Sequence, residues 1–165
     1  MILVSACLLG HSVRYDGGSN AHELLLQYNE CERFVAVCPE CLAMMPVPRP
    51  PMELAHVSGK KVLAGKGQAF DAEGRETTEY LLMGADKLLK IAQDYAAAVA
   101  ILKEGSPSCG VRRIHDGSFT GKKVRGQGVA TALLLKHGLR VYCERDMTAE
   151  LLEKLVMEDM DTHRF

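Results

Sequence analysis

Residues 98–110 read Ala-Val-Ala-Ile-Leu-Lys-Glu-Gly-Ser-Pro-Ser-Cys-Gly, and this stretch decides the fold. The apolar run 98–102 shows little alternation, so it predicts a strand buried on both faces of a parallel sheet. Loop residues 106–110 follow closely. A turn there needs the proline and the glycine, but it does not need a cysteine. Cys109 therefore indicates that the strand presents a thiol at its end.

Three further apolar runs alternate with helical patterns along the chain. The runs are 2–6, 33–37 and 139–142, and the helical patterns cover about 21–31, 77–95, 127–137 and 148–158. This alternation predicts an α/β fold with an open, mostly parallel, Rossmann-like sheet and helices on both faces. We expect a loop excursion or small hairpin in 44–76, with 57–63 as a candidate strand, and a second hairpin in 110–127.

Composition predicts one globular domain over residues 1–165. The chain is 47% apolar and 25% charged, with a net charge of −1. That charge gives no global argument for nucleic acid or a membrane, so any electrostatic recognition must be local. Met1 leads straight into an apolar run without a basic segment, which indicates a first strand instead of a signal peptide. We therefore expect a cytoplasmic protein whose thiols are reduced.

Reduced cysteines are core filler, metal ligands or redox groups. The six cysteines are Cys7, Cys31, Cys38, Cys41, Cys109 and Cys143. Three of them, Cys7, Cys38 and Cys109, each follow one of the first three predicted strands. In open α/β sheets ligands bind beyond the carboxyl ends of the strands, so these thiols are expected to converge. Each alone would be read as a buried thiol, but together they favour a site.

Cys38 and Cys41 also form a CxxC pair. The pair is compatible with a thioredoxin-like dithiol or with half of a zinc site, although no partner motif follows. Two histidines, His11 and His115, lie near the expected site without ligand spacing.

A set of ordered motifs resembles a known bacterial family. The motifs are Ser5-Ala6-Cys7-Leu8-Leu9-Gly10, Arg14-Tyr15-Asp16-Gly17, Cys38-Pro39-Glu40, Pro48-Arg49-Pro50-Pro51-Met52-Glu53, Leu102-Lys103-Glu104-Gly105-Ser106-Pro107-Ser108-Cys109-Gly110 and Ile114-His115-Asp116-Gly117-Ser118-Phe119. They are similar to the YbbK-like family, long described as a domain of unknown function, which includes the thiouracil desulfidases. The resemblance covers about residues 1–145.

The resemblance implies an oxygen-sensitive 4Fe–4S cluster held by Cys7, Cys38 and Cys109, with one iron open. Aerobic handling is expected to remove the cluster or replace it with another metal. The implied substrate is a thiolated pyrimidine, base or nucleotide, whose sulfur is replaced by oxygen with release of sulfide. The matching catalytic residues are Glu40 and Ser106, with Ser108 as the alternative serine.

Four residues within or beside these motifs are expected substrate contacts: Arg14, Asp16, Arg49 and Lys103. The segment 110–128 is the most basic of the chain, and it is either a solvated hairpin face or a grip for a phosphate. Its basic residues are Arg112, Arg113, Lys122, Lys123 and Arg125.

The sequence departs from its relatives at three places. Val13 stands where many relatives have a cysteine. Ala43-Met44-Met45 stands where a glycine pair is common, and these larger side chains are expected to narrow the substrate pocket. Cys41 is unusual and is an alternative ligand to Cys38. Two rival functions remain, a non-catalytic cluster or metal-binding protein acting as sulfur carrier or redox sensor, and a dithiol oxidoreductase using Cys38 and Cys41.

Overall fold

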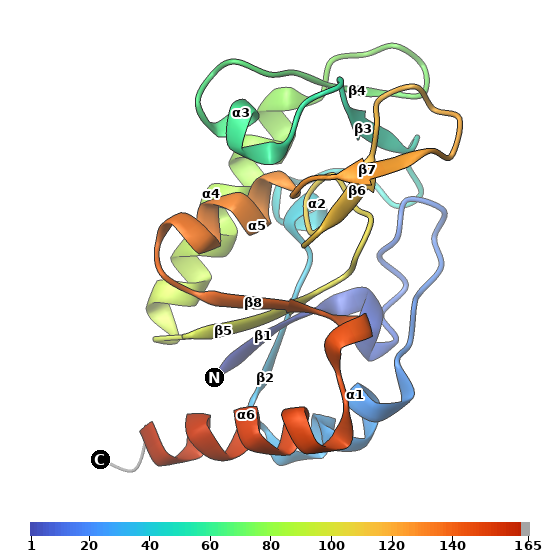
Figure 1. Ribbon diagram of the computed structural model, residues 1–165. Helices are drawn as coiled ribbons and strands as arrows, with labels where there is room; N and C mark the ends of the chain where they lie inside the picture. The colour runs from blue at the N-terminus through green and yellow to red at the C-terminus, as the bar shows by residue number, and fades with distance from the viewer. Residues whose placement is uncertain (163–165) are drawn as a thin grey trace.

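A four-stranded parallel sheet forms the centre of the computed structural model, which describes residues 1–162 (Figure 1). Its strands are β1 (Ile2–Ser5), β2 (Phe34–Val37), β5 (Val99–Leu102) and β8 (Arg140–Cys143), in the order β2-β1-β5-β8. β1 and β5 occupy the centre and are buried at every position, which explains their continuous apolar sequence. All four strands were predicted, and the parallel α/β sheet is confirmed.

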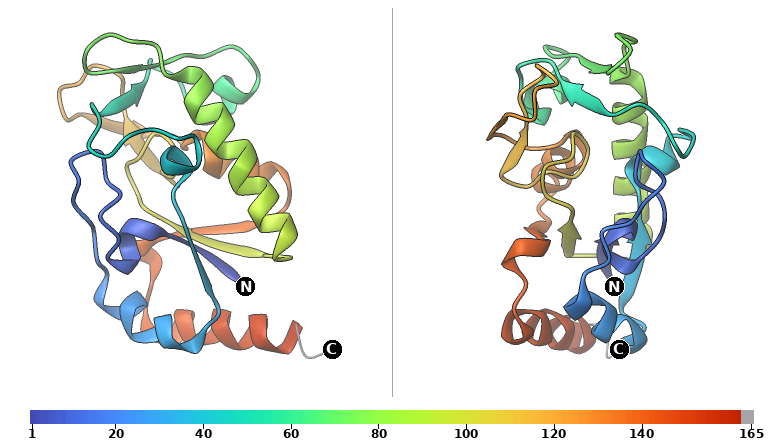
Figure 2. Two further views of the ribbon diagram at one scale, coloured as in Figure 1. Left: turned by 180° about the vertical axis from the view of Figure 1, so that it is seen from behind. Right: turned by 90° about the vertical axis from the view of Figure 1, so that its right-hand side faces the viewer.

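Helices cover both faces of this sheet, as predicted (Figures 1 and 2). The α-helices are α1 (Glu23–Tyr28), α2 (Pro39–Leu42), α3 (Gly59–Leu63), α4 (Thr78–Asp94), α5 (Val129–Lys136) and α6 (Ala149–Thr162), and the 3-10 helices are η1 (Ala6–Leu9), η2 (Asn29–Cys31) and η3 (Glu144–Asp146). α4 and α5 lie above the sheet in Figure 1, and α1 and α6 lie below it. None of the helices in residues 1–162 has the length and apolar character needed to cross a membrane.

Two small antiparallel sheets stand beyond the main one at the upper right of Figure 1. They pair β3 (Met52–Leu54) with β4 (Ala69–Asp71), and β6 (Arg113–His115) with β7 (Lys123–Arg125). The hairpin expected in 110–127 is therefore present as β6–β7, and the excursion in 44–76 contains β3 and β4.

The candidate strand at 57–63 is wrong, because Gly59–Leu63 is helix α3. Gly59 and Val62 are buried while Lys60 and Lys61 are exposed, which is helical spacing, not the alternation of a strand. A side chain at Gly59 would meet the backbone of Gly128 at 2.5 Å, so the glycine allows α3 to pack on the start of α5.

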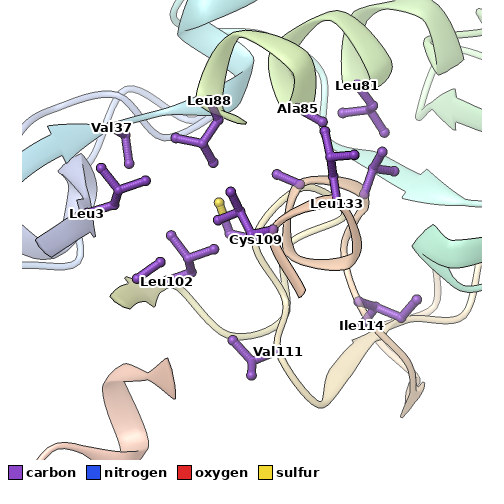
Figure 3. Close-up of a cluster of buried hydrophobic side chains, with 14 of the residues drawn as sticks. Leu3, Val37, Leu81, Ala85, Leu88, Leu102, Cys109, Val111, Ile114 and Leu133 are labelled. Carbon is purple, nitrogen blue, oxygen red and sulfur yellow. The ribbon is translucent and has the colours of Figure 1, made fainter. Parts of the chain in front are cut away.

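The core consists of one buried cluster on each face of the sheet. Leu25 of α1 and Leu152 and Leu155 of α6 belong to the lower cluster. The upper cluster includes Leu88 of α4 and also Cys109, which Figure 3 shows among labelled leucines from β1, α4, β5 and α5. A candidate site residue is thus packed directly into the core.

Candidate active site

A cavity of about 400 Å³ lies at the carboxyl ends of β1, β2 and β5. Residues from both small sheets and from the loop after η1 complete its wall. The polar and sulfur-bearing residues of the wall include Cys7, Arg14, Asn20, Cys38, Glu40, Arg49, Glu53, Lys103, Ser106, Cys109, His115 and Lys123. The structure thus brings Cys7, Cys38 and Cys109 to one cavity at the strand ends.

Cys7 lies in the single 3-10 turn η1 that follows β1. The turn ends at Gly10, whose φ of 87° suits glycine, and the carbonyl oxygen of Cys7 accepts bonds from the N–H groups of Gly10 and Asn20. Burial raises the pKa of the Cys7 thiol, and a hydrogen bond with the Asn20 side chain opposes that rise. Asn20 is a cavity residue that sequence reasoning missed.

Cys38 is the N-cap residue of α2, directly after β2. Burial raises the pKa of its thiol to about 12; the Cys41 backbone opposes this rise and the Cys41 thiol adds to it. α2 can press against α4 because Gly84 has no side chain, and a Cβ there would lie 2.2 Å from the carbonyl oxygen of Pro39. Because Cys38 is the N-cap of α2, the close packing of α2 on α4 determines how deeply Cys38 is buried.

Cys109 lies in the loop after β5, and Glu104 organises that loop. The buried Glu104 carboxylate accepts bonds from the N–H groups of Val111 (2.7 Å), Arg112 and Arg113. Burial alone would raise the pKa of Glu104, but these backbone donors hold it below its usual range. Sequence reasoning missed this role, although a lone acid beside a core strand was a signal for it.

Thr131 supports the same loop from α5, since its hydroxyl donates to the carbonyl oxygen of Cys109 at 2.9 Å. Gly128 packs directly against the same loop, because a Cβ at this glycine would lie 2.3 Å from the Ser108 backbone. Helix α5 and its N-cap thus hold the loop by one hydrogen bond and one close packing contact, and the Ser5 side chain is hydrogen-bonded to the Cys109 thiol.

The three cavity thiols lie near enough to influence one another. Burial raises the pKa of Cys109 well above its usual range, and the nearby Cys38 and Cys7 sulfurs raise it further. Within residues 1–162, no group of three or more His, Cys, Asp or Glu side chains is arranged to hold a single metal ion. A mononuclear zinc site built on the CxxC pair is therefore not formed there.

Glu40 follows Cys38 by two residues and also lines the cavity. Burial raises its pKa, while the Arg49 guanidinium, 3.1 Å away, opposes that rise. Arg49 also donates to the carbonyl oxygens of Val13 (2.9 Å) and Pro46 (3.1 Å). Only 1% of its side chain is exposed, so Arg49 acts on Glu40 and the loops in this structure and presents little surface to a substrate.

The two candidate serines differ in position. Ser106 lines the cavity, and its Oγ accepts bonds from the N–H groups of Ser108 (3.1 Å) and Cys109 (3.2 Å). The Ser108 hydroxyl is buried outside the cavity wall and has no hydrogen-bond partner among residues 1–162. The geometry favours Ser106, whose hydroxyl proton can still be donated toward the cavity.

Comparisons with known proteins agree with this geometry. The 2-thiouracil desulfurase family matches residues 2–146. The chain belongs to this family.

Two relatives show how far the likeness extends. The uncharacterised protein YbbK of Bacillus subtilis (strain 168) is 42% identical over 147 residues, which is 89% of this chain and 97% of that protein. A solved structure of the 4Fe–4S-dependent thiouracil desulfidase TudS superposes with a TM-score of 0.81 at 38% identity, covering 94% of this chain and 97% of that one. The resemblance inferred from the motifs is therefore confirmed.

Within this member of the 2-thiouracil desulfurase family, the expected substrate contacts divide into two groups. Arg14 and Lys103 line the cavity, whereas Asp16 does not. Asp16 instead accepts a bond from the Gly18 N–H and lies 3.6 Å from Arg14. Lys103 Nζ donates to the carboxylate of Glu144 at 2.9 Å, which holds it beside the cavity.

The basic segment is mostly a solvated face, since only Lys123 of its five cations lines the cavity. Arg112 pairs with Asp146 at 2.6 Å and donates to the buried Cys143 sulfur. His115 lines the cavity and its Nδ1 is 3.2 Å from the Gly105 carbonyl oxygen, while His11 is not part of the wall.

The remaining cysteines of this family member stand outside the cavity wall. All six cysteines are free thiols; Cys31 ends η2, Cys143 is a buried strand end, and Cys41 lies on α2 beside Cys38. Val13 is part of the wall, whereas Met44 is 81% exposed and does not belong to it. The methionine therefore does not narrow the cavity as its sequence position led us to expect.

Proposed function

We propose that this protein is a 4Fe–4S-dependent desulfidase that replaces the sulfur of a thiolated pyrimidine by oxygen. One observation carries the proposal: cysteines from three separate strand ends, Cys7, Cys38 and Cys109, line one cavity. The family match and the likeness to TudS agree with it.

The donor set fits such a cluster. Thiolates are the usual protein ligands of iron–sulfur clusters, and three of them leave a coordination position open. When bound, the cluster supplies an open iron that accepts the soft sulfur of the substrate and weakens its carbon–sulfur bond. The pKa values of the three thiols are raised in their buried setting, so they must lose protons when they become ligands.

Glu40 is the proposed general base. Its carboxylate lies in the cavity wall, and its raised pKa brings its proton affinity closer to that of a base that works near neutral pH. It would take a proton from the water that attacks the ring carbon. Arg49 fixes the direction of that carboxylate, and Ser106 would donate its hydroxyl proton to the polar edge of the base.

The reaction balances without an external oxidant or reductant. A carbon–oxygen bond to water forms, the carbon–sulfur bond breaks, and sulfide leaves with the protons of the water. Lys103, Arg14 and Lys123 place cations in a wall that also contains carboxylates, and these cations suit departing sulfide and a thiolated base or nucleotide.

The dithiol alternative is less well supported. A thioredoxin-like pair needs a first thiol of low pKa, whereas burial raises the pKa of Cys38 to about 12. Among the described residues 1–162, we find no contact that favours a non-catalytic sulfur carrier over an enzyme.

The test is sulfide release from 2-thiouracil by protein reconstituted with iron and sulfide without oxygen. We expect uracil and sulfide in equal amounts, and none from protein treated with an iron chelator. Uracil formed equally well by the chelated protein would contradict the role of the cluster.

A further inference from the structure

Phe119 is an aromatic residue in an unusual position at the cavity. It belongs to the loop joining β6 to β7, lines the cavity, and remains 39% exposed. Its φ is 56°, a left-handed conformation that costs a bulky residue free energy. A loop selected only for ease of turning would place glycine or asparagine there.

A buried carboxylate holds Phe119 in this conformation. Glu53 of β3 is 8% exposed, and its Oε1 accepts bonds from the N–H groups of Gly117 (3.0 Å) and Phe119 (3.2 Å). Glu53 thus couples the loop to a different sheet, which keeps the strained backbone in place.

Close packing fixes the same loop a second time. Gly117 has a φ of 98°, and a Cβ there would lie 2.5 Å from the carbonyl oxygen of Leu54. The loop tip is therefore pressed onto β3. Two separate contacts, one polar and one steric, fix the loop backbone that carries Phe119 in the cavity wall.

We propose that Phe119 is a specificity-determining residue whose ring stacks on the flat aromatic ring of the substrate and orients it in the cavity. This inference rests on the proposed function for the identity of the ring. An aromatic side chain on a fixed backbone has only two side-chain torsions to order, so it provides a stacking face at low entropic cost. Stacking on an aromatic side chain tolerates any base, so it selects for planarity rather than for one pattern of hydrogen bonds.

Glu53 is in this account a positioning residue that acts through Phe119. Glu53→Gln retains an acceptor oxygen for both N–H groups, whereas Glu53→Ala removes it. Only the second change should release the loop.

The experiment measures uracil binding by calorimetry on the reconstituted protein, together with KM and kcat for 2-thiouracil. We expect Phe119→Leu to weaken uracil binding and raise KM about tenfold with little change in kcat, while Phe119→Tyr stays near wild type. Tyr80→Leu, which changes an exposed aromatic residue outside the cavity wall, is the control and should leave uracil binding and KM unchanged. Unchanged uracil affinity in Phe119→Leu would overturn the proposal.

A double-mutant comparison separates positioning from general stability. Glu53→Ala should weaken uracil binding in the wild-type background and add nothing in the Phe119→Leu background, and an additive loss would remove Glu53 from this role. Because uracil binding needs no turnover, a Phe119-dependent affinity in a protein that releases no sulfide would support this inference while refuting the desulfidase activity.

Discussion

Cys109 has the deepest position of the three cavity cysteines, with 6% of its surface exposed and core leucines around it (Figure 3). We predict that Cys109→Ser abolishes cluster binding, because a hydroxyl is a poor ligand for iron and water cannot easily replace it there. Iron and acid-labile sulfide content check this. Cys31→Ser, a change outside the cavity wall, is the control and should leave both contents unchanged. Full iron content in Cys109→Ser would show that the ligand assignment is wrong.

Glu40 provides the second prediction at this scale. Glu40→Gln should keep the cluster, since the amide fills the same space, but lower the rate of sulfide release about 10²–10⁴-fold through loss of the base. Single-turnover rates on protein of matched iron content measure this. Glu79→Gln, on the exposed side of α4, should be without effect. A wild-type rate in Glu40→Gln would exclude Glu40 from the chemistry.

At the scale of elements, the contact between α2 and α4 depends on Gly84. Gly84→Ala would gain about 1 kcal/mol in helix propensity, yet we expect a net loss of about 1–3 kcal/mol because the methyl group meets the Pro39 backbone. Urea unfolding measures the change in free energy. Asp86→Ala, at an exposed position of the same helix, should be neutral or stabilising. Greater stability in Gly84→Ala would show that the two helices pack less closely.

The strands could be predicted because their apolar runs are continuous and the glycines and cysteines mark their ends. Cys7, Cys38 and Cys109 could be grouped for the same reason, since parallel strands deliver their carboxyl ends to one edge. Helix α3 was missed because a short segment with one buried valine has no clear period. The roles of Asn20 and Glu53 could not be predicted, because they depend on contacts between segments distant in sequence. The role of Glu104 was missed although its place as a lone acid beside a core strand was a signal for it.

At the scale of the whole molecule, Asp159 connects the C-terminal helix α6 to the start of the sheet. It accepts bonds from Arg33 (2.7 Å) and from the N-terminal amine (2.6 Å). Burial alone would raise its pKa, but these two cations lower it. The folded-state pKa is thus below that of the unfolded chain, so the stabilisation is present above about pH 4 and is lost as the pH falls through the folded value.

We therefore predict that Asp159→Asn destabilises the protein at pH 7 and that the difference from wild type shrinks as the pH falls below about 4. Chemical unfolding at several pH values measures this. A difference that stays constant down to acid pH would show that packing, not charge, is what Asp159 contributes. If residues 1–165 form the single domain that we propose, fluorescence and circular dichroism should report one coincident transition in these experiments.

The central claim is that this cavity holds a 4Fe–4S cluster on three cysteines. The most direct measurement is the iron and acid-labile sulfide content, with the visible spectrum, of protein reconstituted without oxygen. We predict about four irons and four sulfides per chain with broad absorption near ~400 nm. Protein that takes up no iron under these conditions would contradict the account.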